Sequence, residues 1–226
     1  MKGKGASSFD QRSVIGSYAV NAMRNVPGLD DLHRMTMLLL DEAASRDGRI
    51  IVIGAGGGME IAALGQMRPD WDFIGVDTSP EMLTLARETT EAIRRRVELI
   101  GGDVESLPQT CADAATCLLV FHHVDKSERR RILKGVHSRL RPGGRFVLVE
   151  HAAIGIEPEK WLARSAAFSQ HEGIDRVEAA ARAAMMRKRL TLLSPDETER
   201  LMGDSGFHDV ELFYAAFSFR GWVASA

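Results

Sequence analysis

The chain has 226 residues, which suffices for one α/β domain with a substantial hydrophobic core. Lys and Arg total 29, Asp and Glu total 31, and the formal net charge of −2 argues against nucleic-acid or membrane partners. No apolar run approaches the ~20 residues that span a bilayer, no signal-peptide core is present, and the two cysteines fit neither a zinc site nor a disulfide framework. We therefore expect one cytoplasmic domain over residues 1–226, with a small-molecule partner and no metal, and a homodimer stays open.

Short β-branched runs alternate with helical stretches from Arg49 onward, which is the pattern of a parallel sheet covered by helices on both faces. Such crossovers are almost always right-handed, and this restricts the strand order. The last two runs are expected to pair antiparallel at the sheet edge. The sequence thus predicts an α/β fold with a doubly wound, mostly parallel, seven-stranded sheet. The expected strands cover residues 49–53, 72–76, 97–100, 115–121, 145–150, 210–214 and 217–223.

Several helix ends are encoded locally. Ser79 and Ser194 each precede a proline and first-turn acids, which predicts a serine-capped helix at both places. Pro142-Gly143-Gly144 predicts the close of a helix that ends near Leu140 and the start of the fifth strand.

Two segments lie outside the alternation that forms the core of residues 49–151. Residues 1–48 contain an expected helix over 29–45, and a helical insertion is expected over 157–190, before the C-terminal helix and strands of 194–226. Ligands of open α/β sheets bind outside the carboxyl ends of the strands, so both segments are candidates for a helical lid. The alternative is that they are packing helices.

A glycine cluster follows the first expected strand. Glycine lets the backbone turn tightly and approach a ligand closely, because it has no Cβ. Gly54, Gly56 and Gly58 have a GxGxG spacing, whereas the dinucleotide fingerprint needs a glycine or alanine where this chain has Met59. The lysine and hydroxyl residue of a P-loop are also absent. A nicotinamide dehydrogenase is therefore disfavoured.

Acids end the next two strands. Asp77 lies 23 residues after Gly54, where a carboxylate can accept hydrogen bonds from both hydroxyls of a ribose. Asp103 follows the third strand, where it can accept a hydrogen bond from an adenine amino group while Met82 and Val104 hold the ring. Either acid alone is more often a turn or cap residue. A glycine loop, an acid and an acid at three successive strand ends predict an adenosine site.

Residues 48 to about 150 resemble the core of the class I S-adenosylmethionine-dependent methyltransferases. Phe121-His122-His123-Val124 and the stretch over residues 140–144 also resemble small-molecule members. The resemblance implies a Rossmann-like fold with S-adenosylmethionine as cofactor, its methionine part on the glycine loop. Val52 departs from the family, because many members carry an acid there. The implied cofactor-binding residues are Tyr18, Arg24, Gly54, Ala55, Gly56, Gly58, Asp77, Thr78, Met82, Asp103, Val104 and Phe121.

The two ends of the chain, residues 23–28 and 193–223, are similar to the carboxy-S-adenosylmethionine synthases, a related family that acts in tRNA wobble-uridine modification. Those enzymes use an arginine of the lid helix to bind the extra carboxylate of carboxy-S-adenosylmethionine. An ungapped alignment anchored on Ser194 places Met185 at that position, with Arg182 and Arg187 within one turn. The resemblance therefore implies the topology and the lid placement, but not the substrate.

In-line methyl transfer needs positioning and the exclusion of water rather than a nucleophilic triad. A hydroxyl, phenol or protonated amine acceptor benefits from a general base, and histidine titrates near neutral pH. The candidate catalytic residues are His122, His123 and His151, at or just past strands four and five, although strand-end packing is the alternative role.

We therefore expect methyl transfer to a small-molecule acceptor. Chemistry that does not methylate stays open, as a carboxy-S-adenosylmethionine synthase-like transferase or as a lyase or cyclase that releases methylthioadenosine. A non-catalytic adenosine-binding regulator also stays open.

Overall fold

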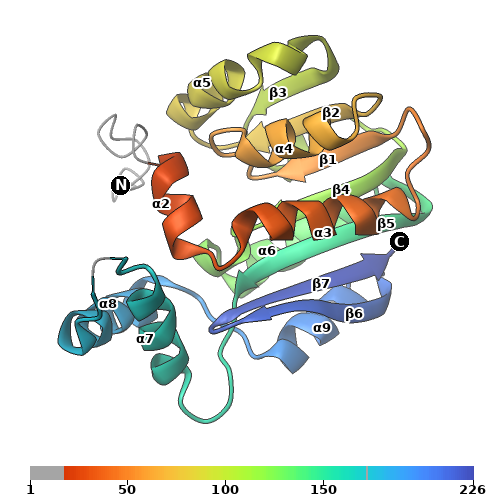
Figure 1. The fold of residues 1–226 in the computed structure, drawn as a ribbon. Helices are drawn as coiled ribbons and strands as arrows, with labels where there is room; N and C mark the ends of the chain where they lie inside the picture. The colour runs from red at the N-terminus through yellow and green to blue at the C-terminus, as the bar shows by residue number, and fades with distance from the viewer. Residues whose placement is uncertain (1–17, 172) are drawn as a thin grey trace, which may run out of the picture.

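The computed structural model describes residues 18–171 and 173–226, and their strands form one seven-stranded sheet (Figure 1). The strand order is β3-β2-β1-β4-β5-β7-β6. The first five strands pair in parallel, and β7 pairs antiparallel with both β5 and β6. The doubly wound, mostly parallel sheet is confirmed. The strands are β1 (Arg49–Ile53), β2 (Asp72–Asp77), β3 (Val97–Gly101), β4 (Ala112–Leu118), β5 (Leu140–His151), β6 (His208–Ala216) and β7 (Phe219–Ser225).

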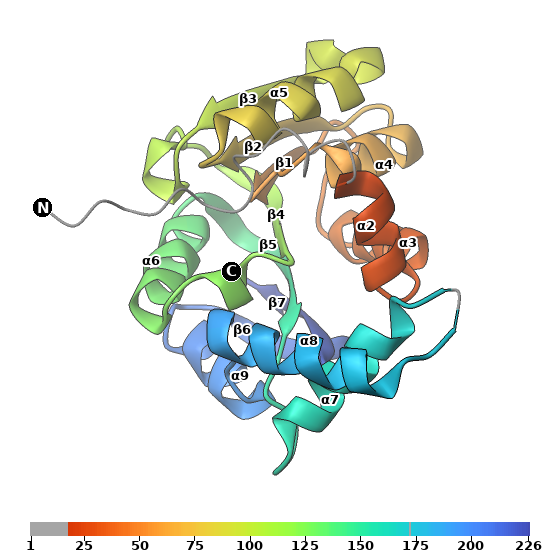
Figure 2. The ribbon, with the colours of Figure 1, turned by 90° about the vertical axis from the view of Figure 1, so that its left-hand side faces the viewer.

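Helices cover both faces of the sheet. α3, α4 and α5 lie on one face, and α6 and α9 lie on the other (Figures 1 and 2). The α-helices are α2 (Tyr18–Asn25), α3 (Leu29–Asp41), α4 (Met59–Met67), α5 (Pro80–Thr89), α6 (Lys126–His137), α7 (Pro158–Phe168), α8 (Arg176–Arg189) and α9 (Pro195–Gly203). Short 3₁₀ helices are η1 (Glu91–Arg96), η2 (Val104–Ser106) and η3 (Phe121–His123).

The period-two alternation of the strands divides the core into two layers. In β1, Ile50 and Val52 pack with α3 and α4, whereas Ile51 and Ile53 pack with α6 and α9. All four side chains are buried, as expected for a parallel strand covered on both faces. Burial of each such side chain contributes about 1.5–3 kcal/mol before the entropy of ordering it is subtracted.

Two boundaries differ from the prediction. The fourth strand covers 112–118 rather than 115–121, because Leu119 has a left-handed φ of 64° and η3 begins at Phe121. The fifth strand begins at Leu140, and α6 ends at His137. The glycines after Pro142 therefore do not separate a helix from a strand. They lie in an irregular part of β5, where the register with β4 shifts and Gly143 has a φ of 74°.

Both serine caps are confirmed. The Ser79 Oγ accepts a hydrogen bond from the Met82 backbone N–H at 3.2 Å and so caps α5. Ser194 forms a reciprocal capping box with Glu197 at the start of α9.

The insertion over residues 157–190 forms the helices α7 and α8, which pack on one another, and α7 contacts α2. Figure 2 looks onto the carboxyl ends of the parallel strands and shows α2, α7 and α8 around that end. This is where a lid would lie, and the lid role stays a prediction. The part of the expected N-terminal lid before residue 18 lies outside the described residues.

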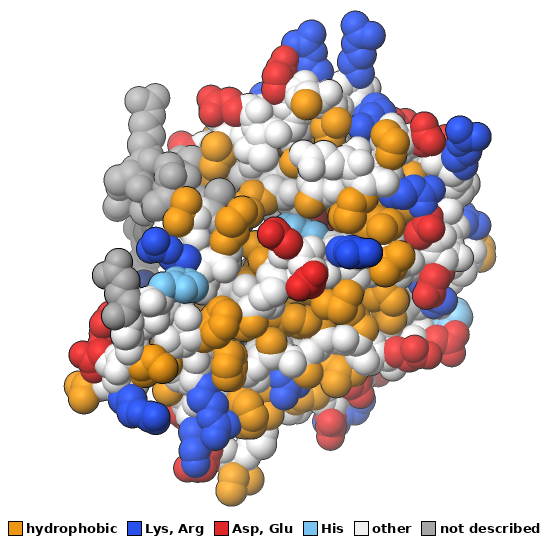
Figure 3. Space-filling model, viewed as in Figure 1, with side chains coloured by type: hydrophobic (Ala, Val, Ile, Leu, Met, Phe, Trp, Pro, Cys, Tyr) orange, Lys and Arg blue, Asp and Glu red, His pale blue; other side chains and the backbone are white. Residues whose placement is uncertain are grey.

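Basic and acidic side chains are interspersed over the face shown in Figure 3, in agreement with the balanced composition. None of the helices within the described ranges combines the length and apolarity needed to cross a membrane.

Candidate active site

A cavity of about 340 Å³ opens at the carboxyl ends of β1, β2, β3 and β4. The glycine loop, the start of α5, the start of η2 and the η3 region form its wall, and α6 closes one side. This is the end of a parallel sheet at which ligands bind, because the loops that leave neighbouring strands diverge there. Eight of the predicted site residues line the cavity, namely Gly54, Gly56, Asp77, Thr78, Met82, Asp103, Val104 and His123.

The glycine loop requires glycine at specific positions. Gly54 and Gly56 have φ values of 70° and 52°, a region that side-chain-bearing residues rarely adopt. A Cβ on Gly54 would lie 2.3 Å from a methyl group of Val120, so the residue also permits close packing against the loop after β4. Gly58 serves packing too, because a Cβ there would lie 2.9 Å from the Ala86 backbone in α5. Gly58 is the N-cap residue of α4 and does not line the cavity.

Asp77 joins the glycine loop to the start of α5. Its Oδ2 accepts a hydrogen bond from the Gly56 N–H at 2.8 Å, and its Oδ1 accepts one from the Ser79 N–H at 2.9 Å. The two backbone donors fix the direction of the carboxylate in the wall, and each oxygen keeps a further lone pair for a ligand hydroxyl. A carboxylate oriented in this way suits a vicinal diol.

Asp103 begins η2 beside Val104, which is buried in the cavity wall together with Met82. The Asp103 Oδ1 accepts a hydrogen bond from the Glu105 N–H at 3.0 Å, and its Oδ2 accepts one from the Arg131 Nη2 at 2.7 Å. The Arg131 guanidinium holds the pKa of Asp103 below its usual value. The site therefore pairs an ionised acceptor with two apolar side chains, which suits an aminopurine ring.

The three candidate catalytic histidines lie together, but of the three only His123 lines the cavity. The ring of His122 lies 4.3 Å from that of His123 and 4.8 Å from that of His151, between centroids. His123 lies at the exposed rim, and partial burial of its ring lowers its pKa. A histidine with a lowered pKa is neutral at pH 7 and can accept a proton.

The other two histidines are buried in the fold. The Nδ1 of His122 accepts a hydrogen bond from the His151 backbone N–H at 3.2 Å, and burial lowers its pKa well below the usual value. His151 stacks on Phe219, its Nδ1 lies 2.7 Å from the Ser218 Oγ, and burial lowers its pKa to about 3. Their geometry suits the packing role that the sequence left as the alternative.

Some predicted cofactor residues do not line the cavity. Ala55 is buried behind the loop, and Phe121 is buried in the core with the Arg129 guanidinium 5.7 Å from its ring centre. Arg24 is exposed on α2, and the side chain of Tyr18 lies outside the described part of the chain. Their roles toward a ligand stay predictions.

Further lining residues were missed in the sequence. Leu119, Val120 and Val124 line the cavity because β4 ends early and η3 turns the chain across the sheet. Glu128 and Ile132 reach it from the same face of α6, and their spacing of four residues was the available signal.

The two arginines near the lid position Met185 are bound within the insertion. The Arg182 Nη1 donates to the Ser169 Oγ at 2.9 Å, and the Arg187 Nε donates to the Glu159 Oε1 at 3.1 Å. Both bonds join α8 to α7 or to the turn that follows it, while the Met185 side chain is exposed.

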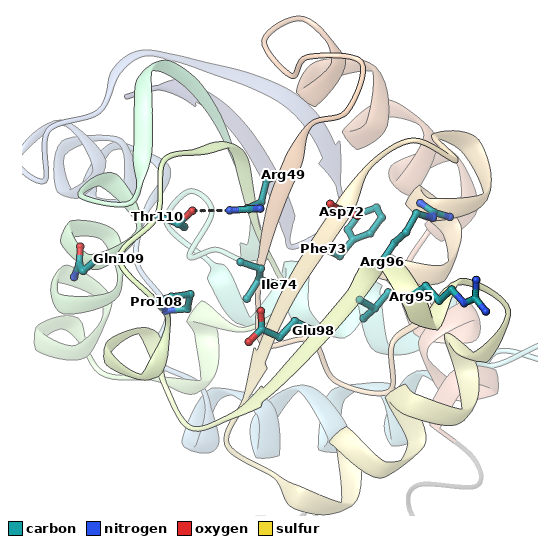
Figure 4. Close-up of a pocket in the computed structure, with 11 residues that line it drawn as sticks. Arg49, Asp72, Phe73, Ile74, Arg95, Arg96, Glu98, Pro108, Gln109 and Thr110 are labelled. Carbon is teal, nitrogen blue, oxygen red and sulfur yellow. Dashed lines mark hydrogen bonds between the residues drawn. The ribbon is translucent and has the colours of Figure 1, made fainter.

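A second hollow of about 360 Å³ lies at the amino ends of the strands (Figure 4). Its Arg96 is committed to the backbone carbonyls of Trp71 and Gly65, at 2.6 and 3.2 Å. Arg49 donates to the Thr110 Oγ1 at 3.3 Å, and Figure 4 shows the Arg95 side chain directed away from the other lining side chains. The hollow contains none of the predicted site residues.

Comparisons with known proteins agree with this fold. A family model described as a methyltransferase domain matches residues 50–144. The carboxy-S-adenosyl-L-methionine synthase of Chromohalobacter salexigens is 25% identical over 96% of this chain and 82% of its own length.

Two solved structures share the fold. The methyltransferase of Haloferax volcanii, in a complex with the Trm112 methyltransferase activator, has a TM-score of 0.65 and 19% identity and covers 97% of each chain. The pyocyanin biosynthetic protein PhzM has a TM-score of 0.61 and 22% identity over 80% of this chain, which spans half the length of PhzM.

The cavity has its glycine loop and two acids at the ends of the strands that the methyltransferase-domain model covers. The strand order, this model and the full-length relatives agree on one assignment. Residues 50–144 match the methyltransferase-domain family model, and the chain has the fold of the class I S-adenosylmethionine-dependent methyltransferases.

Proposed function

We propose that this protein transfers the methyl group of S-adenosylmethionine to a small-molecule acceptor, with His123 as the general base. The methyltransferase-domain match and the carboxy-S-adenosyl-L-methionine synthase relatives both support S-adenosylmethionine as the cofactor. The observation that carries the proposal is the cavity at the carboxyl ends, which combines the glycine loop, Asp77, Asp103 and one rim histidine. The cofactor supplies a methyl group on a sulfonium, which is already a strong electrophile.

The residues present fit this cofactor. Gly54 and Gly56 leave the loop without side chains where a methionine moiety would lie, and Asp77 presents a fixed carboxylate for the ribose hydroxyls. Met82 and Val104 offer apolar contacts for adenine, beside the Asp103 carboxylate. We assign no cofactor contact to the position of Val52, which is buried in the core.

The part of the protein in catalysis is to position the acceptor, exclude water and accept a proton. Alignment of an acceptor lone pair with the methyl group can lower the barrier by roughly 7–11 kcal/mol. His123 is placed to take the acceptor proton, because its ring lines the cavity and is neutral at pH 7. Solvent exclusion would come from α2, α7 and α8, which lie around this end of the sheet.

A carboxy-S-adenosylmethionine synthase-like reaction is the second candidate, favoured by relatives of that name over 96% of the chain. The side chains of the insertion favour methyl transfer instead. Met185 stands where the resemblance implies the carboxylate-binding arginine, and Arg182 and Arg187 are engaged with α7 or its following turn. A carboxylate on the cofactor would have to displace one of these contacts.

The decisive experiment has two steps. The first is mass spectrometry of small molecules released by denaturing the purified protein. S-adenosylhomocysteine supports the proposal, S-adenosylmethionine supports the cofactor that both candidates share, and a cofactor heavier by a carboxyl group supports the second candidate.

The second step is incubation with S-adenosylmethionine, with and without a panel of hydroxyl, phenol and amine acceptors. Formation of S-adenosylhomocysteine that depends on an acceptor is the expected result. Steady release of methylthioadenosine without an acceptor would instead identify a lyase.

A further inference from the structure

One guanidinium on α6 joins three carboxylates at the rim of the cavity. The Arg131 Nη2 lies 2.7 Å from the Asp103 Oδ2 and 2.5 Å from the Glu128 Oε1. Its Nε donates to the Glu128 Oε2 at 3.0 Å, and its Nη1 lies 3.5 Å from the Glu105 Oε1. The grip on Glu128 is bidentate, which fixes the plane of the guanidinium.

This arrangement determines the direction of the Asp103 carboxylate. One of its oxygens is held by the Glu105 N–H and the other by Arg131, so the carboxylate cannot rotate without losing a charged hydrogen bond. Arg131 is itself anchored, because Glu128 lies on the same helix. The Glu128 backbone N–H donates to the Asp125 Oδ1 at 2.9 Å, which caps the start of that helix. A rigid helix therefore sets the orientation of an acceptor in the cavity wall.

Charge gives Arg131 a second effect. Asp103, Glu105 and Glu128 would repel one another without the guanidinium, and the pKa of Asp103 would lose the influence that now holds it down. The side chains of Arg131 and Asp103 are 35% and 42% exposed, so solvent and salt screen the pair and its contribution to folding is small. The pair matters instead for ligand recognition, because it determines from which ligand group the carboxylate accepts a hydrogen bond.

We propose that Arg131 is a positioning residue for purine recognition, holding the Asp103 carboxylate so that it accepts an amino group and disfavours a purine that carries an oxygen there. The inference rests on the proposed function, since it assumes that adenine lies between Met82 and Val104 beside Asp103. Asp103 alone would identify the amino group only while it stays ionised and directed into the cavity. Arg131 maintains the direction from a position 28 residues away in the chain.

The test compares S-adenosylhomocysteine with S-inosylhomocysteine, which replaces the amino group by an oxygen, by titration calorimetry. The variants are Arg131→Ala, Arg131→Lys and, as the matched control, Arg130→Ala. Arg130 is the preceding residue on α6 and pairs with Asp204 at 3.5 Å, outside the cavity. Thermal unfolding of each variant is measured in parallel.

We expect Arg131→Ala to weaken S-adenosylhomocysteine binding roughly tenfold, because one charged hydrogen bond no longer orients the acceptor. S-inosylhomocysteine binding should change less, so the ratio of the two affinities shrinks. Arg131→Lys should restore part of the ratio, and Arg130→Ala should leave it unchanged. In Arg131→Ala the adenosine affinity should also begin to fall at a higher pH, because the pKa of Asp103 moves back toward its usual value.

Two results would overturn the inference and leave the proposed function standing. The first is an unchanged affinity ratio in Arg131→Ala. The second is an equal loss for both ligands together with a lowered melting temperature, which indicates a structural role. A wild-type protein that binds neither ligand would overturn the inference and the adenosine site together.

Discussion

The hollows at the two ends of the sheet have volumes of about 340 and 360 Å³, so size does not distinguish them. At the carboxyl ends, glycines with positive φ expose backbone, and Asp77 is oriented by two backbone N–H groups. At the amino ends, the guanidinium of Arg96 donates hydrogen bonds to backbone carbonyls, and that of Arg49 donates to a neighbouring hydroxyl. Fixed polar groups that can still bind a ligand, rather than cavity volume, distinguish the end to which we assign the proposed site.

We expect the largest effect on cofactor binding from a substitution in the glycine loop, compared with the same substitution of a glycine at the opposite end of the sheet. Gly56→Val should abolish cofactor binding, because the side chain would occupy the cavity wall and φ is 52°. At a ligand concentration of 100 Kd the wild type gains about 2.7 kcal/mol of stability, and the variant should show no ligand-induced rise in melting temperature.

Gly143→Val is the matched control. Its φ of 74° makes it equally unfavourable for valine, yet it lies in the amino-end part of β5 with open space around it. This variant should lose stability but retain the ligand-induced shift. Equal shifts in wild type and Gly56→Val would show that the loop does not hold the cofactor.

The second prediction concerns proton transfer. His123→Ala should lower kcat by roughly 10²–10⁴-fold with an acceptor that must lose a proton, because the general base is removed. The cofactor Kd should stay nearly the same. His208→Ala is the control, since His208 is exposed at the start of β6 and pairs with Asp209.

The pH dependence of kcat/KM follows from the direction in which the pKa of His123 is shifted. Burial lowers the pKa of His123 below 6.5, so the neutral, proton-accepting form already dominates at pH 7. In the wild type, kcat/KM for such an acceptor should be flat above about pH 6.5 and should fall at lower pH as His123 gains a proton. A decline that persists unchanged in His123→Gln would assign the titration to another group.

The third prediction compares the two ends of one strand. Asp77→Ala should weaken cofactor binding roughly ten- to a hundredfold, since a charged acceptor contributes about 1.5–3 kcal/mol. Asp72→Ala, at the first residue of β2 and in the amino-end hollow, should leave the affinity within about twofold, because it lies outside the ligand's reach. Calorimetry on both folded variants makes the measurement. Similar affinities for the two variants would contradict the assignment of the ribose site.

The parts of this site that sequence predicted are those encoded by neighbouring residues. The glycine loop, Asp77 and the Ser79 cap each follow directly from one strand, and the parallel pattern alone brings the strand ends together. The end of β4 was predicted three residues late, because the apolar residues up to Phe121 continue the strand composition while a left-handed Leu119 ends it. No local pattern marks that conformation.

Which histidine faces the cavity depends on tertiary structure. His122 and His123 are adjacent in η3, and the rotation of about 120° between neighbouring residues of a 3₁₀ helix places one in the core and the other at the rim. Arg131 escaped prediction for a related reason, because its partner Asp103 belongs to a different strand end. Contacts of this kind follow from helix placement, which the alternation of strands and helices fixes only coarsely.

The smallest effect that we predict concerns the insertion and asks whether the two ends also differ in dynamics. If α7 and α8 form a lid, hydrogen exchange in residues 157–190 should slow when S-adenosylhomocysteine is added, because a segment of low local stability becomes ordered. Ile174 and Val177, around the start of α8, are 67% and 81% exposed, which indicates weak packing there. Gln109 and Thr110, at the amino-end hollow, serve as the internal reference and should exchange at an unchanged rate. Protection of the loop around Gly56 without protection of α7 and α8 would show that the insertion is scaffold. The acceptor would then be selected by the fixed wall around His123, Val120 and Val124.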